Sequence, residues 1–254
     1  MPGEYAVLAS IYDEIGMSDL VNRLTPRLID YAQRIDWLGR RIVVLGCGTG
    51  ASIAYLSQYP YTITGVDNSP EMLEVARDKI DTPDHSIKWL QLDIRDLGNQ
   101  IPTADLVLAL NVFNELSSLR DLEAVFANAQ RVLEPGKLFI FDMLTLQGLA
   151  EAGTQGVEII FNDPKSLNVF SSNDYDYERQ VQTTDYIIYR QRNGNWVRSE
   201  SKLIRRAFPV QAVSSLAQRN NFNIRTIMNA NLEEIEVGTA RTQRVIFFAE
   251  KSST

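Results

Sequence analysis

Short apolar runs alternate with segments of helical periodicity through the first 145 residues of the chain. The run at 42–45, Ile-Val-Val-Leu, has the composition of a strand buried on both faces of a parallel sheet. Strands are predicted over residues 41–46, 61–67, 86–92, 106–110 and 137–143. Helices are predicted between them over residues 50–59, from a Ser69 cap onwards, and over residues 119–133. This alternation predicts an α/β fold.

The two flanking regions follow other patterns. Residues 4–36 are mostly helical in pattern, because apolar side chains recur there at steps of three and four residues. Residues 151–204 instead have runs typical of antiparallel strands, at 157–161, 167–171, 177–189 and 196–203. Asn193-Gly194 is a strong signal for a two-residue hairpin between the last two runs.

The remaining residues return to the earlier alternation. Pro209 is expected to begin a helix over 210–219, and strands are expected at 222–228 and 244–251. We therefore divide the chain into three parts: residues 1–150 with a helical cap and the first five strands, residues 151–204 as a β insertion over the active site, and residues 205–254 with the final helix and last two strands.

A glycine-rich turn follows the first strand and indicates a ligand site. Gly46, Cys47, Gly48 and Gly50 lie between a buried strand and a helix start, where the lack of a Cβ lets backbone approach a ligand. The second strand ends at Asp67, about 20 residues further on, where a carboxylate can accept both hydroxyls of a ribose. Together these features predict an adenosine-containing cofactor, although a simple turn without a ligand is the alternative.

The glycine spacing alone does not identify the cofactor, because Gly46, Gly48 and Ala51 also fit the dinucleotide pattern. Further segments follow in a fixed order: Val-Asp-Asn-Ser-Pro-Glu-Met-Leu at 66–73, Leu-Asp-Ile-Arg-Asp-Leu at 92–97, Asp-Leu-Val-Leu-Ala-Leu-Asn at 105–111 and Leu-Glu-Pro-Gly-Lys-Leu at 133–138. Over residues 38–145 this series closely resembles the class I S-adenosylmethionine-dependent methyltransferases. The resemblance implies a Rossmann-like, seven-stranded, mostly parallel sheet with an antiparallel last strand, an N-terminal helical cap and an antiparallel β insertion.

The resemblance also implies roles for individual residues at the carboxyl edge of the sheet, where open α/β sheets bind ligands. The glycines would pass under the methionine and ribose portion of S-adenosylmethionine, and Asp67 would hold the ribose. The adenine would be flanked by Asn68, Met72, Asp93 and Ile94, and the methionine end would face Asn111 and Val112. Met72 as a core residue and Asp93 as a turn cap are the structural alternatives.

The N-terminal segment also resembles part of this family. Residues 5–13 are similar to the cap of small-molecule methyltransferases, in which aromatic side chains line the site. Tyr5 and Tyr12 are therefore candidates for positioning the substrate. Asn111, at the methionine end, is a third candidate, and no catalytic base is assigned. Packing within the cap is an equal alternative for the two tyrosines.

Composition narrows the choice of partner and compartment. A net charge of −7, with no long basic cluster, disfavours nucleic acid. No apolar run approaches the roughly 20 residues of a membrane span. The single cysteine, Cys47, rules out an internal disulfide and suits a reducing cytoplasm. We expect a cytoplasmic monomer or homodimer that acts on a small molecule.

The acceptor atom is only weakly indicated. The single histidine, His85, precedes the third predicted strand and is a poor base candidate, and no cluster has metal-ligand spacing. A positioned neutral amine needs no strong base, so nitrogen is slightly preferred over oxygen. Tyr175, Tyr177 and Tyr186 could surround a cation or fill the core of the insertion.

We therefore predict an S-adenosylmethionine-dependent methyltransferase that acts on a small molecule. One alternative is a nicotinamide-dependent dehydrogenase, which shares the glycine turn and the acid but should lack the antiparallel final strand. Another is a methyltransferase-like module that binds without turnover.

Overall fold

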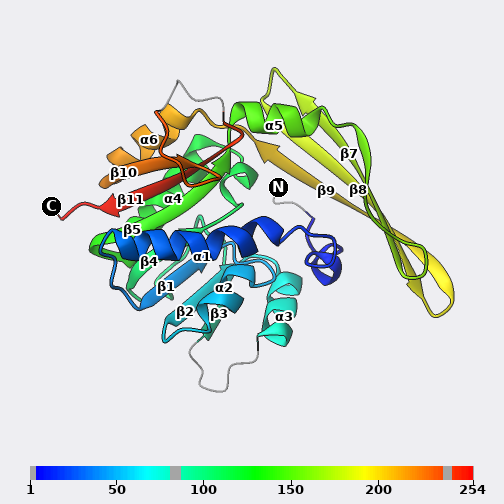
Figure 1. Cartoon of the computed structure of the whole chain (residues 1–254), viewed down its shortest axis with the longest axis horizontal. Coiled ribbons are helices and arrows are strands. Elements are labelled where there is room, and N and C mark those ends of the chain that lie inside the picture. Colours follow the sequence, from blue (N-terminus) through cyan, green and yellow to red (C-terminus); the bar gives the residue numbers. More distant parts are fainter. Residues whose placement is uncertain (1–3, 81–86, 237–241, 254) are drawn as a thin grey trace.

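The computed structural model describes residues 4–80, 87–236 and 242–253 and has two sheets (Figure 1). The larger sheet has seven strands in the order β10-β11-β5-β4-β1-β2-β3. Its strands are β1 (Arg41–Leu45), β2 (Thr62–Asp67), β3 (Ile87–Gln91), β4 (Ala104–Ala109), β5 (Leu133–Leu144), β10 (Phe222–Asn229) and β11 (Arg244–Lys251). Strands β1 to β5 pair in parallel, and β11 is antiparallel to both β5 and β10. The predicted fold class is confirmed.

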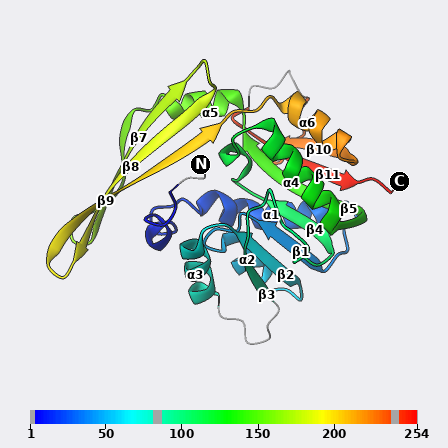
Figure 2. The same cartoon turned by 180° about the vertical axis from the view of Figure 1, so that it is seen from behind.

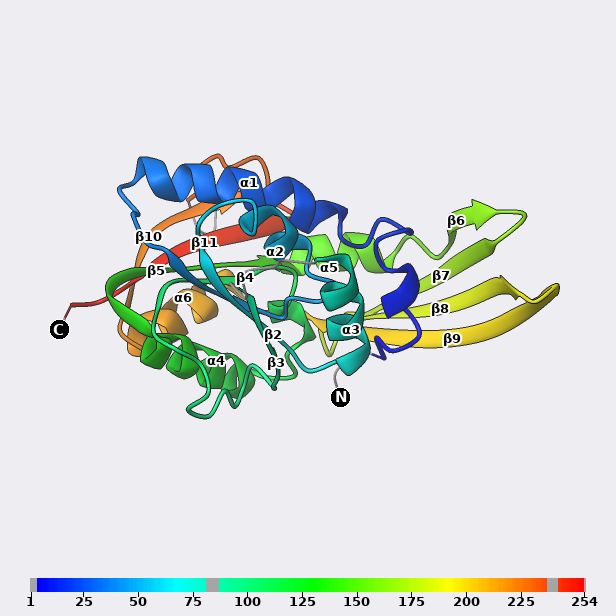
Figure 3. The same ribbon diagram turned by 90° about the horizontal axis from the view of Figure 1, so that it is seen from below.

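Helices cover both faces of this sheet (Figure 3). They are α1 (Asp19–Arg34), α2 (Ala51–Leu56), α3 (Pro70–Lys79), α4 (Leu119–Val132), α5 (Leu146–Gly153) and α6 (Val210–Arg219), with short 3₁₀ turns η1 (Ala9–Ile11) and η2 (Phe113–Glu115). Alternate residues of β1 serve the two faces. Ile42 and Val44 pack in the cluster that includes α1 and α2, and Val43 and Leu45 pack in the cluster that includes α4 and α6.

The predicted elements agree closely with the observed ones in the large sheet. Ser69 caps α3 by accepting a hydrogen bond from the Met72 backbone N–H at 3.2 Å, and Pro70 is the first helical residue, as expected. One difference stands out, because β5 begins at Leu133, before the Pro135-Gly136 pair that was expected to precede it. The third predicted strand begins at Ser86, which lies outside the described residues.

The second sheet is antiparallel and projects from one end of the molecule (Figures 1 and 2). Its strands, in sheet order, are β6 (Val157–Asp163), β7 (Leu167–Asp176), β8 (Val181–Arg192) and β9 (Asn195–Arg206). Asn193 and Gly194 both have positive φ, of 50° and 84°, which confirms the predicted hairpin turn. The strand predicted over 177–189 was wrong at its start, because Tyr177 lies in the β7–β8 turn with 68% of its surface exposed.

The N-terminal cap is less helical than predicted. Only η1 and α1 are helical between residues 4 and 36, and turns connect them. Leu8 and Ile11 are fully buried against the second sheet, in a cluster with Leu167, Val169 and Leu203. These contacts with distant strands hold the cap in place without a continuous helix.

Asp13 joins the cap to the large sheet. Its Oδ1 accepts a hydrogen bond from Thr49 Oγ1 at 2.7 Å, and its Oδ2 pairs with Lys79 Nζ at 2.7 Å. Thr49 belongs to the glycine turn and Lys79 ends α3. The cap is therefore fastened directly over the turn that follows β1.

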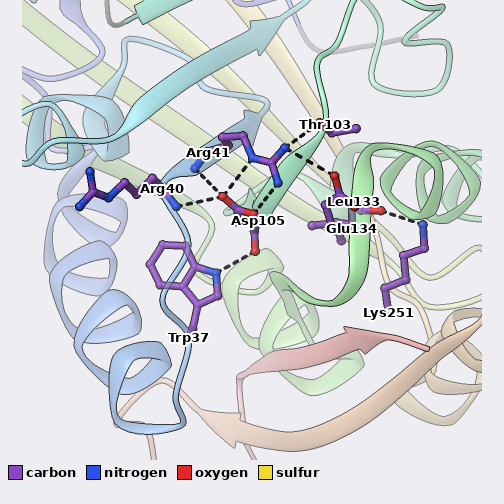
Figure 4. Close-up of polar contacts among 8 residues, drawn as sticks. All are labelled: Trp37, Arg40, Arg41, Thr103, Asp105, Leu133, Glu134 and Lys251. Carbon is purple, nitrogen blue, oxygen red and sulfur yellow. Dashed lines mark hydrogen bonds and ion pairs between the residues drawn. The ribbon is translucent and has the colours of Figure 1, made fainter. Parts of the chain in front are cut away.

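At the opposite edge of the sheet, Asp105 fastens β4 to β1 (Figure 4). Its carboxylate accepts hydrogen bonds from the backbone N–H groups of Arg40 and Arg41, at 3.0 and 2.9 Å, and from Arg41 Nη2 at 2.7 Å. Its backbone carbonyl accepts from Trp37 Nε1 at 2.7 Å. Within the described residues, no helix is long and apolar enough to cross a membrane.

Candidate active site

A cavity opens at the carboxyl ends of β1, β2 and β4 and runs under the N-terminal cap. Measured out to the solvent at its mouth, it has a volume of about 1080 Å³. The residues singled out from the sequence that line it are Tyr5, Tyr12, Gly46, Cys47, Gly48, Asp67, Asn68, Met72, Asp93, Ile94, Asn111 and Val112. Among the predicted cofactor-binding residues, Gly50 is the one that does not line it.

Different structural constraints require glycine at the three positions of the turn. All three have positive φ, of 63° at Gly46, 52° at Gly48 and 80° at Gly50. A Cβ at Gly46 would lie 2.4 Å from Val112 Cγ2, and one at Gly50 would lie 2.8 Å from Ile80 Cδ1. A Cβ at Gly48 would meet no atom within 4 Å. Gly48 therefore leaves open space beside the cavity, whereas Gly46 and Gly50 are required by packing as well as by conformation.

Asp67 is held by the backbone at the end of β2. Its Oδ2 accepts from Gly48 N–H at 2.8 Å and its Oδ1 accepts from Ser69 N–H at 2.9 Å. Burial raises the pKa of Asp67, and these backbone hydrogen bonds oppose that rise. Asp67 therefore also has a structural role, because it braces the glycine turn. Each oxygen keeps a further acceptor site, which fits a pair of ribose hydroxyls.

Three other predicted residues have packing or polar partners of their own. Met72 is 2% exposed and belongs to the helix core. Asp93 forms an ion pair with Arg95 at 2.5 Å, and this guanidinium lowers the pKa of Asp93. Burial, with a smaller contribution from the nearby Asp67 charge, raises the pKa of the Cys47 thiol well above its usual range. Cys47 is therefore held as a neutral thiol, which makes it a poor nucleophile.

Asn111 has an unusual conformation that a buried ion pair supports. Its φ is +60°, and its backbone N–H donates to Asp142 Oδ1 at 2.5 Å. Asp142 is fully buried and pairs with Arg244 Nη1, while Arg244 Nη2 donates to the Asn111 carboxamide oxygen at 3.3 Å. That contact turns the carboxamide oxygen toward Arg244. Burial raises the pKa of Tyr12 to about 12, and a side-chain hydrogen bond from Asn111 is among the contacts that oppose the rise.

Sequence reasoning missed a buried charged cluster at the cap end of the cavity. Glu115 lines the cavity, accepts a hydrogen bond from the Tyr5 hydroxyl, and has Arg205 Nε 3.8 Å from its Oε1. The Glu115 and Arg205 side chains are 15% and 17% exposed. Burial raises the pKa of Glu115, while Arg205 and Tyr5 oppose the rise. The available signals were weak: Glu115 follows Asn111 on the same segment, and Arg205-Arg206 is an adjacent basic pair.

The tyrosines of the second sheet do not line the cavity. Tyr175 packs with Leu149 and Ala207, and Tyr186 packs in the cluster that contains Leu8. These positions favour the packing interpretation for both, and Tyr177 is exposed. His85 lies outside the described residues.

Comparison with known proteins gives a consistent result. Residues 43–141 match the family model of the methyltransferase domain. The chain is 26% identical to YqeM of Bacillus subtilis (strain 168), a candidate methyltransferase by name, over 98% of each chain. It is 24% identical to the ubiquinone biosynthesis O-methyltransferase of Coxiella burnetii (strain Dugway 5J108-111), over 56% of this chain and 59% of that protein.

Solved structures share the fold over nearly the whole chain. A S-adenosylmethionine-dependent methyltransferase from Clostridium acetobutylicum superposes with a TM-score of 0.82 at 19% identity, covering 98% of this chain and 99% of that one. CalS10, an amino pentose methyltransferase from Micromonospora echinaspora solved with S-adenosylmethionine, superposes with a TM-score of 0.67 at 15% identity, covering 91% of each chain.

Proposed function

We infer that this chain methylates a small molecule. Its motifs, its strand order and its methyltransferase domain over residues 43–141 are those of a class I S-adenosylmethionine-dependent methyltransferase. We further propose nitrogen over oxygen as the acceptor atom. The antiparallel β11 argues against the dehydrogenase alternative, which should lack such a strand.

The cavity-lining residues support a specific arrangement of cofactor contacts. Asp67 would accept the ribose hydroxyls with the acceptor sites that Gly48 and Ser69 leave free. The open space at Gly48 would let the backbone come close to the ligand. Asn68, Met72, Asp93 and Ile94 would surround the adenine, and Asn111 and Val112 would face the methionine end. When bound, S-adenosylmethionine supplies an electrophilic methyl group on a positively charged sulfur.

One observation supports a small acceptor most strongly: the cap forms part of the wall of the cavity. Tyr5 and Tyr12 line it, and Asp13 ties their segment to Thr49 and Lys79. A cavity covered in this way favours a compact molecule over a long polymer. The net charge of −7 also disfavours a polyanionic acceptor such as nucleic acid.

The preference for nitrogen has a chemical basis. An amine attacks the methyl carbon once its lone pair is free, and the protein then contributes mainly by positioning it. Tyr5 and Tyr12 present aromatic rings to the cavity, with centroids 6.2 Å apart, and aromatic faces attract ammonium-like groups. Among the compared proteins one is an amino pentose methyltransferase and another is an O-methyltransferase, so the acceptor needs a direct test.

The test is formation of S-adenosylhomocysteine by the full chain with panels of small amines, phenols and alcohols. We expect turnover with at least one amine and lower rates with oxygen acceptors of similar shape. Cofactor binding without turnover on any panel would favour the non-catalytic module. Turnover confined to phenols or alcohols would contradict the preference for nitrogen. A parallel fluorescence titration with NADH, expected to show no binding, checks the dehydrogenase alternative.

A further inference from the structure

One part of the cavity wall has no role in the cofactor contacts proposed above. It is the acceptor cluster, defined here as Tyr5, Tyr12, Glu115 and Arg205, of which all but Arg205 line the cavity. We propose that Glu115 is the acceptor-binding residue, which pairs with a protonated amine and then takes its proton. This proposal rests on the proposed function and adds a catalytic residue and a charge requirement for the substrate.

The Glu115 carboxylate has an oxygen available to a ligand. Three acidic side chains line the cavity: Asp67, Asp93 and Glu115. Asp67 is held by two backbone N–H groups, and the Arg95 guanidinium bonds to both oxygens of Asp93. The contacts of Glu115 with Tyr5 and Arg205 are both made through Oε1. Within the described part of the chain, Glu115 Oε2 accepts no hydrogen bond, so it can accept one from a ligand.

The charges of the acceptor cluster also favour a cationic ligand. A buried carboxylate is costly unless it has a cationic partner or hydrogen-bond donors. Arg205 and Tyr5 provide both to Glu115 Oε1, and Arg205 is not among the residues that line the cavity. An ionised Glu115 is therefore stabilised from the protein side through Oε1, and its Oε2 is the oxygen left to meet a ligand. A cation is the complementary ligand.

Glu115 also lies close in the chain to the residues assigned to the methionine end of the cofactor. Asn111 and Val112, assigned to the methionine end, lead directly into η2, which ends at Glu115. Tyr5 and Tyr12 line the same cavity with their ring centroids 6.2 Å apart, and the Tyr5 hydroxyl donates to Glu115. A carboxylate flanked by aromatic rings is a suitable site for an alkylammonium group.

The proton transfer balances simply. The N–H bond of the ammonium breaks, its electron pair stays on nitrogen, and the proton forms an O–H bond with Glu115. That electron pair then forms the N–CH₃ bond, while the electrons of the broken S–C bond remain on sulfur. Burial raises the pKa of Glu115, which makes this carboxylate a stronger base than one in water.

The experiment is calorimetric titration of the protein, saturated with S-adenosylhomocysteine, with three ring compounds of similar shape. These are cyclohexylammonium, cyclohexanol and cyclohexanecarboxylate. We expect the wild-type complex to bind cyclohexylammonium at least tenfold more tightly than either of the others. Equal or tighter binding of cyclohexanol would overturn the proposal, as would the absence of saturable cyclohexylammonium binding. Preferential binding of the carboxylate would assign the cavity to an anion instead.

The Glu115→Gln variant provides the second comparison, with exposed Glu158→Gln as its matched control. We expect Glu115→Gln to abolish the preference for cyclohexylammonium while S-adenosylhomocysteine binds as in wild type, and Glu158→Gln to change neither. An unchanged preference in Glu115→Gln would refute the role of this residue. If the wild type does not bind S-adenosylhomocysteine, that result would instead count against the proposed function. If Glu115→Gln does not fold, the wild-type comparison of the three compounds still decides the charge requirement.

Discussion

Gly48 can be compared with a second glycine of similar backbone conformation that lies away from the cavity. It has a φ of +52° and no neighbour where a Cβ would stand, and it lines the cavity. Gly136 has a φ of +73° and similar open space, but it lies in β5 and does not line the cavity. The two glycines therefore share the same conformational constraint and differ only in their place in the molecule.

This difference gives a prediction at the level of single residues. Alanine at either position should destabilise the protein by a similar amount, about 1 kcal/mol, because both adopt the left-handed region. Gly48→Ala alone should weaken S-adenosylhomocysteine binding, because its methyl group enters the cavity. Urea unfolding and calorimetry of both variants test this. Equal binding by the two variants would mean that the backbone at Gly48 does not approach the ligand.

Functional residues could be predicted from the sequence where their partners are close along the chain. Residues whose partners are distant along the chain were missed. The glycine turn and Asp67 belong to adjacent strands, so their spacing was enough to find them. Glu115 gains its role from Tyr5, 110 residues away, and from Arg205 on the second sheet. Asp142 is similar, because Arg244 comes from β11. Periodicity carries no information about contacts of this kind.

At the scale of elements, strand and helix positions in the α/β part followed from their apolar runs. The observed α6, Val210–Arg219, and β11, Arg244–Lys251, agree with the predicted ranges at both ends. The helix α5, Leu146–Gly153, was not predicted, and residues 4–18 of the cap consist mainly of turns. Both segments lie against the second sheet, which provides packing partners that local sequence does not reveal.

Asp105 gives a pH prediction for the pairing of β1 with β4. Hydrogen bonds from Arg41 hold the pKa of Asp105 well below its usual range. A lowered pKa in the folded state stabilises the fold above the unfolded pKa of about 3.9, and this stabilisation is lost as the pH falls toward the folded pKa. Asp105→Asn should therefore cost about 2 kcal/mol at neutral pH, and this cost should shrink below about pH 4.

Urea unfolding of wild type and Asp105→Asn at pH 7, 5 and 3 measures this difference, with exposed Asp174→Asn as the control. The control should stay close to wild type throughout. A cost for Asp105→Asn that is as large at pH 3 as at pH 7 would show that the carboxylate charge is not the stabilising feature.

At the scale of the whole molecule, the cap contacts both sheets and forms part of the wall of the cavity at the carboxyl edge of the large sheet. Leu8 and Ile11 pack on the second sheet, while Asp13 bonds to the glycine turn and to α3. Tyr5 and Tyr12 thereby enter the wall of a cavity whose floor is the carboxyl edge of the large sheet. The acceptor cluster takes Tyr5 and Tyr12 from the cap, Glu115 from η2 and Arg205 from β9, so neither sheet could supply it alone.

The central claim is that this edge binds S-adenosylmethionine, with Asp67 on the ribose, and calorimetric titration with S-adenosylhomocysteine tests it most directly. Wild type and the exposed control Asp78→Asn should bind alike, and Asp67→Asn should bind at least about tenfold more weakly, because it loses a charged acceptor. Thermal unfolding of Asp67→Asn should first show that the variant is folded, since Asp67 also braces the glycine turn. No binding by wild type at high micromolar concentrations, or equal binding by folded Asp67→Asn, would contradict the account.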